Sequence, residues 1–391
     1  MVDLIPKKDF VPQSAAVLGS TGSVGTQTLD VLRELGIPVK LLTAGANVAL
    51  LAEQIREFRP AAAAVSSEKA AAELSSLLGG DSPEIIYRTD EVCDAIEKTD
   101  ANVIFHSVSG LAGTTYALAA ARSGKRVGMA NKEAIIALGD LIFETMARSG
   151  GQMIPVDSEH SAIFRCLEGR DIRDVSKIVL TASGGPFFGR SAEELARVTV
   201  ADTLNHPTWK MGKKITVDSA TLMNKGFEII EAVRLFGVPE DRVDVVIHRQ
   251  SIIHSLVEYN DNTLLAQLGR PDMRDCIRYA ATAPHPHRTA GDKLDLAALG
   301  KLTFDYPDTK AFPLLDAARS AIRIGGTCPA SLIAADEEAV DAFLKEKIGF
   351  TDIAAYVLET LEKVPVSYEL TEESAADAVK TARAVCASLI G

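Results

Sequence analysis

Short hydrophobic runs alternate with longer helical patterns along residues 15–156. The runs have the length of strands that are buried on both faces, and the stretches between them repeat apolar residues with a helical period. This alternation predicts an α/β fold that begins with a doubly wound, Rossmann-type sheet. The predicted strands are Ala15–Leu18, Val39–Ala44, Ala62–Val65, Val103–Phe105, Arg126–Met129 and Met153–Val156, and the helices between them include Thr26–Leu35, Val48–Phe58, Glu68–Leu78 and Lys132–Arg148.

The pattern changes at residue 157. Strand-like segments joined by loops rich in glycine, proline and serine predict a central α+β catalytic domain over residues 157–283. Residues 284–310 read as a connector, residues 311–391 as a helical C-terminal domain, and residues 1–14 as a flexible leader. The strands predicted after residue 157 are Lys177–Thr181, Lys214–Val217, Val243–His248 and Leu264–Leu268, and the C-terminal helices are Leu314–Ile324, Pro329–Lys345 and Ala375–Leu389.

Composition narrows the classes of function. The formal net charge of −12 argues against sequence-independent nucleic-acid binding, which needs a surplus of lysine and arginine. The five cysteines stand singly, which favours reduced thiols over a disulfide framework. No apolar stretch approaches the roughly 20 residues of a membrane span. We therefore expect a cytoplasmic protein that binds neither nucleic acid nor membrane.

A glycine-rich turn follows the first predicted strand. Its sequence, Gly19-Ser20-Thr21-Gly22-Ser23-Val24-Gly25, leads directly into a helix. Glycines there permit a tight turn and close approach of backbone amides to a pyrophosphate, and the helix N-terminus favours anionic oxygen. The spacing is GxxGxxG and not GxGxxG, so the position between strand and helix carries the prediction of a dinucleotide site, against a purely structural turn.

The end of the second predicted strand bears on the choice of dinucleotide. It reads Thr43-Ala44-Gly45-Ala46-Asn47, without the acidic residue that would bind a ribose 2′-hydroxyl and repel a 2′-phosphate. NADP is therefore permitted, although no lysine or arginine at this turn selects it.

Two carboxylates follow the predicted strand that ends at Val156. Asp157 and Glu159 flank Ser158, and in extended chain both would point the same way. Hard carboxylates that converge at a strand end suit Mg²⁺ or Mn²⁺. The alternative is structural, with Asp157 or Ser158 capping a helix that has Glu159 in its first turn.

The segment Asp218–Glu228 favours the metal reading. It is expected to form a helix from Ser219, on which Asn224, Lys225 and Glu228 share one face. Glu228 would be a third carboxylate for an oxygen-rich metal site. The competing reading is an ordinary Lys225–Glu228 pair on a solvated surface.

Two loops are candidates for binding substrate. Thr181-Ala182-Ser183-Gly184-Gly185-Pro186-Phe187 offers a hydroxyl and backbone amides to a phosphate. Residues 205–212 contain His206 and the only tryptophan of the sequence, Trp209, and suit a mobile flap. His206 and Trp209 could equally serve packing.

Together these segments resemble the 1-deoxy-D-xylulose 5-phosphate reductoisomerase family. The resemblance rests on LGSTGSVG from Leu18, ANKE from Ala130, IPVDSEHSAIF from Ile154, TASGGPF from Thr181, HPTWKMGKKITVDSATLMNKG from His206, QSIIHS from Gln250 and LAQLGRPDMR from Leu265. It implies NADPH-dependent isomerisation and reduction of 1-deoxy-D-xylulose 5-phosphate to 2-C-methyl-D-erythritol 4-phosphate, in the methylerythritol phosphate route to isoprenoid precursors. It also implies a homodimer.

The resemblance further implies roles for individual residues. The metal ligands for Mn²⁺ or Mg²⁺ would be Asp157, Glu159 and Glu228, and the catalytic residues Lys132 and Glu159. The substrate would contact Ser158, Ser183, His206, Trp209, Ser219, Asn224, Lys225 and Glu228, with Met211 in the flap. NADPH would contact Thr21, Gly22, Ser23, Val24, Gly45, Asn47, Asn131, Lys132, Glu133 and Gly212.

The chain departs from the family pattern at several positions. Arg249 stands where the family usually has proline, and Ala46 where relatives often have lysine or arginine. Ile333 and Asp336 replace two asparagines, and Ser107–Gly113 replaces a more apolar run. Apart from Ala46, which weakens the argument for NADPH over NADH, these changes are expected to affect packing or domain contacts.

Two other functions are compatible with a glycine turn alone. A metal-free Rossmann reductase of another small substrate would tolerate Asp157→Asn. A non-catalytic NADPH-binding sensor would bind cofactor without turnover, and would leave the three carboxylates unexplained.

Overall fold

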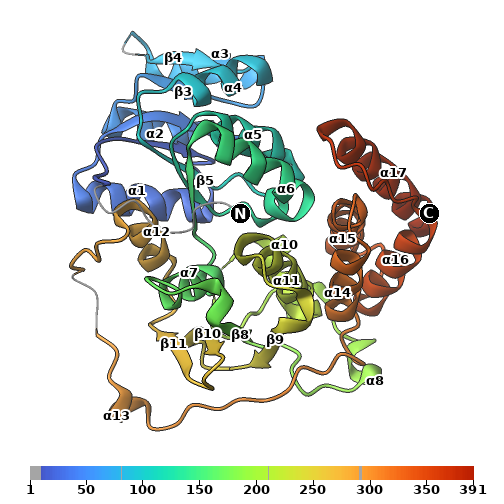
Figure 1. The fold of residues 1–391 in the computed structure, drawn as a ribbon. Coiled ribbons are helices and arrows are strands. Elements are labelled where there is room, and N and C mark those ends of the chain that lie inside the picture. Colours follow the sequence, from blue (N-terminus) through green and yellow to red (C-terminus); the bar gives the residue numbers. More distant parts are fainter. Residues whose placement is uncertain (1–9, 81, 210, 290–292) are drawn as a thin grey trace. The chain divides into compact units, whose positions relative to one another are not determined.

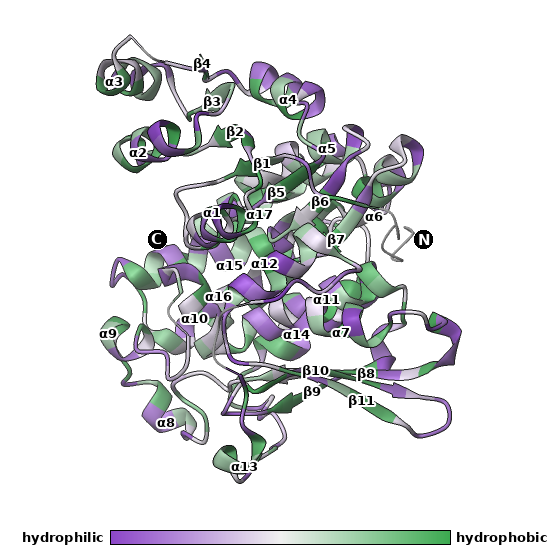
Figure 2. Ribbon diagram, turned by 90° about the vertical axis from the view of Figure 1, so that its left-hand side faces the viewer, coloured by the Kyte–Doolittle hydropathy of each residue, from purple (hydrophilic) through white to green (hydrophobic). Residues whose placement is uncertain are grey.

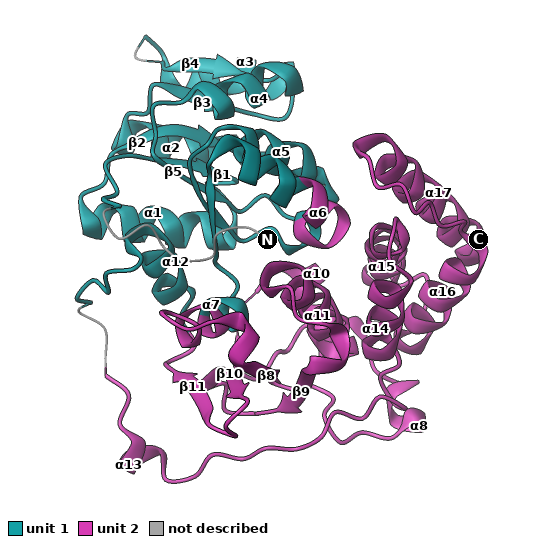
Figure 3. Cartoon of the chain, in the orientation of Figure 1, with its two compact units in different colours: residues 1–134, 142–161, 272–291 teal, residues 135–141, 162–271, 292–391 magenta. Residues whose placement is uncertain are grey.

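The computed structural model describes residues 10–80, 82–209, 211–289 and 293–391 (Figure 1). Residues 1–9 of the predicted leader thus lie outside the described residues. Contacts divide the chain into two compact units, each built from separate stretches of sequence (Figure 3). Unit 1 contains residues 1–134, 142–161 and 272–291, and unit 2 contains residues 135–141, 162–271 and 292–391.

A parallel seven-stranded sheet forms the centre of unit 1, in the order β4-β3-β2-β1-β5-β6-β7. The order reverses direction beside β1, as in Rossmann-type sheets. The strands are β1 Ala15–Leu18, β2 Val39–Thr43, β3 Ala62–Ala64, β4 Glu84–Ile86, β5 Val103–His106, β6 Arg126–Met129 and β7 Gln152–Pro155. The helices that contribute to unit 1 are α1 Ser23–Leu35, α2 Val48–Phe58, α3 Glu68–Leu78, α4 Thr89–Lys98, α5 Thr114–Arg122, α6 Lys132–Ser149, α7 Ser158–Cys166 and α12 Met273–Thr282. Residues 135–141 of α6 and 162–166 of α7 are counted with unit 2.

Burial explains why these runs become strands. All residues of β1, β5, β6 and β7 are buried. Figure 2 shows that β1 and β5 are largely hydrophobic, as buried strands are expected to be. The sequence prediction of the doubly wound sheet is confirmed. It missed β4, a three-residue edge strand whose Glu84 is exposed, because so short a strand leaves almost no periodic signal.

Helix α12 belongs to unit 1 although it follows the strands of unit 2 in sequence. Arg274 pairs with Asp30 of α1 at 3.0 Å, and Arg278 pairs with Glu34 of α1 at 2.6 Å. The predicted boundary after residue 283 therefore differs from this division into units. The reason is that α12 lies on α1, a contact between segments far apart in sequence.

Unit 2 contains a four-stranded sheet in the order β11-β10-β8-β9. Its strands are β8 Val175–Ala182, β9 Val243–Ile247, β10 Ile253–Tyr259 and β11 Leu264–Leu268, with β8 and β9 parallel and the other pairs antiparallel. Three of these strands were predicted, and β10 was missed. Helix α11, Met223–Phe236, packs against β8 and β9.

The predicted strand Lys214–Val217 is wrong. These residues lie in α10, Lys213–Thr221, whose buried side chains include Thr216, Val217, Ala220 and Thr221. The alternation of Ile215 and Val217 with polar residues imitated a strand, but burial follows the helical period. Nor does one helix run from Ser219, because α10 ends before Leu222, whose φ of 61° breaks the helix from α11.

The C-terminal part of unit 2 is helical, as predicted. Its helices are α14 Leu314–Ile324, α15 Cys328–Leu344, α16 Phe350–Lys363 and α17 Glu372–Ile390, and the shorter helices of this unit are α8 Ala192–Leu195, α9 Val200–Thr203 and α13 Leu296–Leu299. The predicted connector contains α13, and Asp305 exchanges backbone hydrogen bonds with Ile247 of β9 at 2.8 and 2.9 Å. In the described residues, no helix is both long enough and apolar enough to cross a membrane.

A buried charge cluster joins α10 to α15. Lys214 Nζ lies 2.7 Å from a carboxylate oxygen of Asp218 and 2.7 Å from one of Asp336. The side chains of Asp218 and Asp336 are only 3% and 0% exposed. Burial raises the pKa of Asp336, and the nearby Lys214 ammonium offsets this only in part. One ammonium thus serves two buried carboxyl groups.

We predict that Asp336→Asn stabilises the protein at neutral pH. A folded-state pKa above the unfolded value means that Asp336 favours the folded state at low pH and disfavours it as pH rises through the folded-state pKa. Removing the buried charge should therefore add about 1–2 kcal/mol to the free energy of unfolding at pH 7–8, with less gain in acid. Urea unfolding followed by circular dichroism measures this effect.

Asp341→Asn is the matched control, since Asp341 is an exposed carboxylate of the same helix, paired with Lys345. It should change stability by less than about 1 kcal/mol. A loss of stability in Asp336→Asn at neutral pH would show that the ionised carboxylate is the stabilising form.

Candidate active site

The glycine turn between β1 and α1 has a backbone that only glycine fits at two positions. Gly19 has a φ of 79°, and a Cβ on Gly25 would lie 2.1 Å from the carbonyl oxygen of Gly19. Gly22 precedes α1 at the N-cap position and makes no side-chain cap. The first N–H groups of α1 therefore lack a cap from this position, which is the arrangement that binds phosphate at a helix N-terminus. Thr21, Ser23 and Val24 lie in this turn.

A second turn, between β2 and α2, is tied to the glycine turn. The backbone N–H groups of Gly19 and Ser20 donate to the carbonyl oxygen of Thr43 at 3.0 and 2.8 Å. Gly45 and Asn47 lie in the second turn, and Asn47 caps α2 by accepting from the N–H of Leu50 at 3.3 Å. The structure therefore gives the Asn47 side chain a structural task in addition to its predicted contact with the cofactor.

Gln54 of α2 fixes the glycine turn, and the sequence analysis missed it. Ser20 Oγ donates to Gln54 Oε1 at 2.7 Å, and Gln54 Nε2 donates to the carbonyl oxygen of Ser20 at 2.9 Å. Both residues are buried. The available signal was a glutamine on the apolar face of α2, beside Leu51 and Ile55, where a buried polar side chain needs partners.

Asn131 organises the loop that follows β5. Its Oδ1 accepts from the N–H of Ala134 at 2.6 Å and so caps α6, while its Nδ2 donates to the carbonyl oxygens of Val108 and Gly110. His106 was also missed. It is fully buried, its Nε2 donates to the Gly113 carbonyl at 2.9 Å, and burial lowers its pKa to about 4. The neutral ring and Asn131 together hold this loop at the carboxyl edge of the sheet.

Charged groups meet where β7 ends. Asp157 forms an ion pair with Lys132 at the start of α6, and Ser158 Oγ donates to the carboxylate of Glu159. Burial acts to raise the pKa of Asp157, but the Lys132 ammonium holds it well below its usual range. Asp157 therefore stays ionised, as a metal ligand must. Glu133 lies beside Lys132 in the first turn of α6.

On α11 of unit 2, an amide, an ammonium and a carboxylate are in contact. Asn224 Nδ2 donates to one oxygen of Glu228 at 2.5 Å, and Lys225 pairs with the other. Lys225 and Glu228 are buried, at 4% and 1% exposure, so the alternative of a solvated surface pair is wrong. The predicted common face is confirmed, although the helix starts later than expected.

His206 connects the two loops that were proposed to bind substrate. Its Nδ1 accepts from the backbone N–H groups of Thr208 and Trp209, at 3.2 and 2.9 Å. Nδ1 therefore carries no proton, and the proton of the neutral ring lies on Nε2. Nε2 lies 3.0 Å from Ser183 Oγ and 3.1 Å from Ser219 Oγ, so it donates to both hydroxyls.

This arrangement leaves the two hydroxyl hydrogens available. Ser183 Oγ also accepts from the N–H of Gly185 at 3.2 Å. A hydroxyl oxygen that accepts from protein groups can still donate its own hydrogen to an anion. The structure thus brings Ser183, His206 and Ser219 together as predicted. Trp209 lies near His254, with ring centroids 6.5 Å apart, and Gly212 is the N-cap of α10, while residue 210 of the predicted flap lies outside the described residues.

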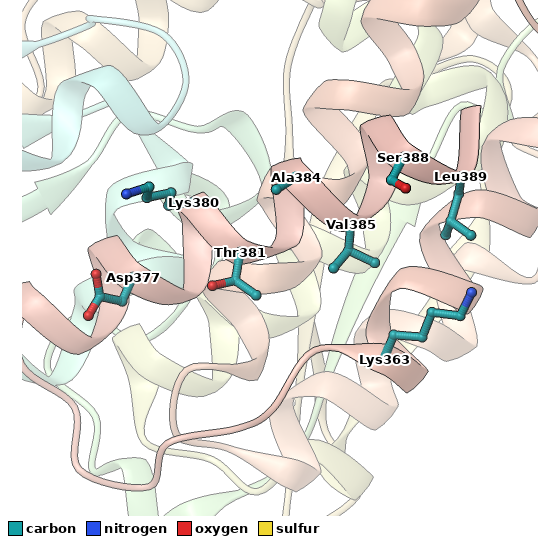
Figure 4. Close-up of a pocket in the computed structure, with 8 residues that line it drawn as sticks. All are labelled: Lys363, Asp377, Lys380, Thr381, Ala384, Val385, Ser388 and Leu389. Carbon is teal, nitrogen blue, oxygen red and sulfur yellow. The ribbon is translucent and has the colours of Figure 1, made fainter. Parts of the chain in front are cut away.

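A separate pocket of about 710 Å³ lies along α16 and α17 (Figure 4). Its lining residues are Lys363, Asp377, Lys380, Thr381, Ala384, Val385, Ser388 and Leu389, so it contains none of the predicted site residues.

The sheet order, the glycine turn and the polar residues at the strand ends define an α/β enzyme of the Rossmann class. Residues 15–139 match the 1-deoxy-D-xylulose 5-phosphate reductoisomerase domain family, and residues 153–236 and 268–385 match two C-terminal domain families of the same enzyme. The chain belongs to the 1-deoxy-D-xylulose 5-phosphate reductoisomerase family.

Individual relatives agree with this assignment along the chain. The reductoisomerase of Pelodictyon phaeoclathratiforme is 48% identical over 90% of this chain and 92% of its own length. That of Caulobacter vibrioides is 47% identical over 95% of this chain and 93% of its own.

Solved structures agree as well. The Zymomonas mobilis reductoisomerase in complex with NADPH has a TM-score of 0.91 and 39% identity, covering 97% of this chain and 99% of that one. A reductoisomerase in complex with NADPH, fosmidomycin and magnesium has a TM-score of 0.90 and 37% identity, covering 97% and 98%.

We predict that His206 stays neutral, with its proton on Nε2, down to about pH 5. Burial, and secondarily the charge of Arg249, lowers its pKa to about 4, from an ordinary value of 6.5. Because the folded-state pKa is depressed, the neutral His206 ring contributes fully to the free energy of unfolding above pH 6.5. This contribution is lost as the pH falls towards 4. NMR of protein labelled with ¹⁵N-histidine reports both the tautomer and the titration.

His285, which is exposed, provides a comparison within the same spectrum. A His206 ring that titrates near 6.5, or one with its proton on Nδ1, would contradict the assigned hydrogen bonds.

Proposed function

We propose that this enzyme isomerises and reduces 1-deoxy-D-xylulose 5-phosphate to 2-C-methyl-D-erythritol 4-phosphate, with NADPH as reductant and Mg²⁺ or Mn²⁺ as metal. The observation that supports this most directly is the Ser183–His206–Ser219 cluster, whose hydroxyls suit a phosphate monoester. Relatives that match nearly the full chain carry this activity in their names. In the cell, the reaction supplies the methylerythritol phosphate route to isoprenoid precursors.

The cofactor is proposed to lie at the carboxyl edge of the unit 1 sheet. The N-terminus of α1, with Thr21, Gly22, Ser23 and Val24, would hold the pyrophosphate. Gly45 and Asn47 would contact the adenosine end. The β6–α6 turn would contribute Asn131, Lys132 and Glu133, with Gly212 from the flap. The solved relatives with NADPH support this choice, whereas exposed Ala46 offers no charge to the 2′-phosphate.

The metal is proposed to be held by Asp157, Glu159 and Glu228. This donor set fits a hard divalent cation, because all three ligands are carboxylates and Lys132 keeps Asp157 ionised. When bound, the metal would act as a Lewis acid that polarises the substrate carbonyl. A solved relative contains magnesium.

The protein's own side chains would orient the substrate and move protons. Lys132 is fixed by Asp157, so its ammonium can donate to a substrate oxygen, and Ser158 can do the same. Glu159 accepts a hydrogen bond from Ser158 and is the carboxylate that we propose to exchange a proton. Lys132 and Glu159 are therefore the proposed catalytic residues.

The opposite end of the substrate is proposed to bind in unit 2. Ser183 and Ser219 would donate hydroxyl hydrogens to the phosphate, while Lys225 and Asn224 would add a charge and an amide. His206 holds both hydroxyls and the Trp209 backbone, so phosphate binding would position the flap. A closed flap, with Trp209 and Met211, excludes water from the reacting carbons.

We predict that NADPH oxidation, followed at 340 nm, requires both 1-deoxy-D-xylulose 5-phosphate and Mn²⁺. Glu228→Gln should reduce turnover by about 100-fold or more, because a neutral amide replaces an anionic ligand. Glu193→Gln, an exposed carboxylate of α8, should leave turnover unchanged.

Each alternative gives a different result in this assay. NADPH binding without turnover in any metal would favour a sensor. Turnover that is indifferent to chelation would retain a reductase and reject the metal site.

The enzyme is further proposed to be a cytoplasmic homodimer. Five cysteines that stand singly in the sequence, an odd number, support a reducing compartment. Strand β11 forms one edge of the unit 2 sheet, and its Leu264 is 51% exposed. An exposed apolar edge strand is a template for pairing with a second copy.

We predict a mass of twice 41.7 kDa by light scattering after size-exclusion chromatography. Leu264→Lys should shift the mass towards the monomer at micromolar concentration, because a charge would be buried in the new interface. Leu77→Lys changes a leucine that is 42% exposed in unit 1 and should not shift it. A monomeric wild-type protein would contradict the proposal.

A further inference from the structure

Arg249 lies beside the proposed phosphate-binding turn. It follows β9 in unit 2 and is half-buried. Its Nη1 donates to the carbonyl oxygens of Gly185 and Ser183, at 2.9 and 3.3 Å. Its guanidinium also lies over the ring of Phe188, 5.2 Å from the ring centroid. One arginine thus holds the turn by two carbonyl groups and by the aromatic residue that follows it.

The turn needs such support because its backbone is unusual. Gly184 and Gly185 both have positive φ, at 75° and 63°. A Cβ on Gly185 would lie 2.7 Å from the Ser219 carbonyl oxygen, so this turn approaches α10 closely. Consecutive glycines have many other conformations available, and fixing them costs conformational entropy. Arg249 binds the conformation in which Ser183 Oγ contacts His206.

The positive charge of Arg249 also affects the Ser183–His206–Ser219 cluster. It is the charge that contributes, after burial, to the low pKa of His206. His206 therefore stays neutral and adds no charge of its own to the phosphate site. Arg249 supplies a positive charge instead. The carbonyl groups of Ser183 and Gly185 accept hydrogen bonds from its guanidinium and so help to orient that group.

We propose that Arg249 is a positioning and specificity residue for the phosphate end of the substrate. It fixes the Ser183–Gly185 turn in its binding conformation and adds a positive field that favours a dianionic phosphate. This inference rests on the proposed function, since the anion it serves is the substrate phosphate. It goes beyond the expectation that Arg249 affects packing or domain contacts.

Binding of inorganic phosphate tests the inference without turnover. The probe is the fluorescence of Trp209, the only tryptophan of the sequence, whose backbone N–H donates to His206 Nδ1. Arg249→Met should raise the Kd of phosphate about tenfold. The difference from wild type should shrink at high ionic strength, because a charge contribution is screened. Arg249→Lys keeps the charge and should give an intermediate Kd.

Arg190→Met is the matched control. Arg190 is exposed and also lies over a phenylalanine, Phe187, with 5.2 Å between its guanidinium and the ring centroid. It should leave the Kd of phosphate within about twofold of wild type, because Arg190 is exposed, where solvent and salt screen its charge, and among the described residues it donates no hydrogen bond to the Ser183–Gly185 turn. If Arg190→Met weakened phosphate binding as much as Arg249→Met, the effect would be a general one of charge and the inference would be overturned.

Steady-state kinetics separates this inference from the proposed function. With 1-deoxy-D-xylulose 5-phosphate, Arg249→Met should raise KM about tenfold and change kcat less than about threefold. If wild type turns the substrate over and Arg249→Met keeps both KM and phosphate Kd, only the role of Arg249 fails. If wild type shows no turnover, the proposed function fails. Circular dichroism melting shows whether each Arg249 variant is folded. If Arg249→Met is not folded, Arg249→Lys provides the test.

Discussion

Burial of both faces of the parallel sheet is the constraint on which unit 1 depends. Every residue of β1, β5, β6 and β7 is buried, so polar and charged groups are confined to the strand ends. At the carboxyl ends of these strands lie the glycine turn, the Asn131 turn and the Asp157 turn. The chemistry of the unit follows from this confinement, because successive turns meet along one edge of the sheet.

In unit 2, a hydrogen-bond network centred on His206 positions the polar groups. The Ser183 turn and the start of the flap contribute one hydroxyl and one imidazole, and the end of α10 contributes Ser219. The two nitrogens of His206 have separate tasks, since Nδ1 accepts from the flap backbone and Nε2 donates to the hydroxyls. Arg249 completes the arrangement by holding the turn from outside. The hydroxyl groups beside the neutral His206 ring and the positive charge of Arg249 together suit the binding of an anion.

The departures from the family pattern differ in their structural consequences. Asp336 adds a second buried carboxyl group beside the Lys214–Asp218 pair, and burial raises its pKa. Arg249 donates to carbonyl groups beside the proposed phosphate site, and we propose a role in binding for it. A substitution that the sequence suggests is a change in packing can therefore bear on stability or on ligand binding. Which of the two it affects depends on the groups that the new side chain contacts.

The sequence by itself determined the doubly wound sheet, the glycine turn and the shared face of Asn224, Lys225 and Glu228, because these depend on neighbours close along the chain. It failed for Lys214–Val217, where an alternating pattern was overridden by helical burial. Only the tertiary structure decided that α12 lies on α1, that Gln54 holds Ser20, and that His206 joins Ser183 to Ser219. These contacts join residues that are distant in sequence. The local pattern of hydrophobic and polar residues does not indicate which distant residue forms a hydrogen bond or ion pair with a given buried polar group.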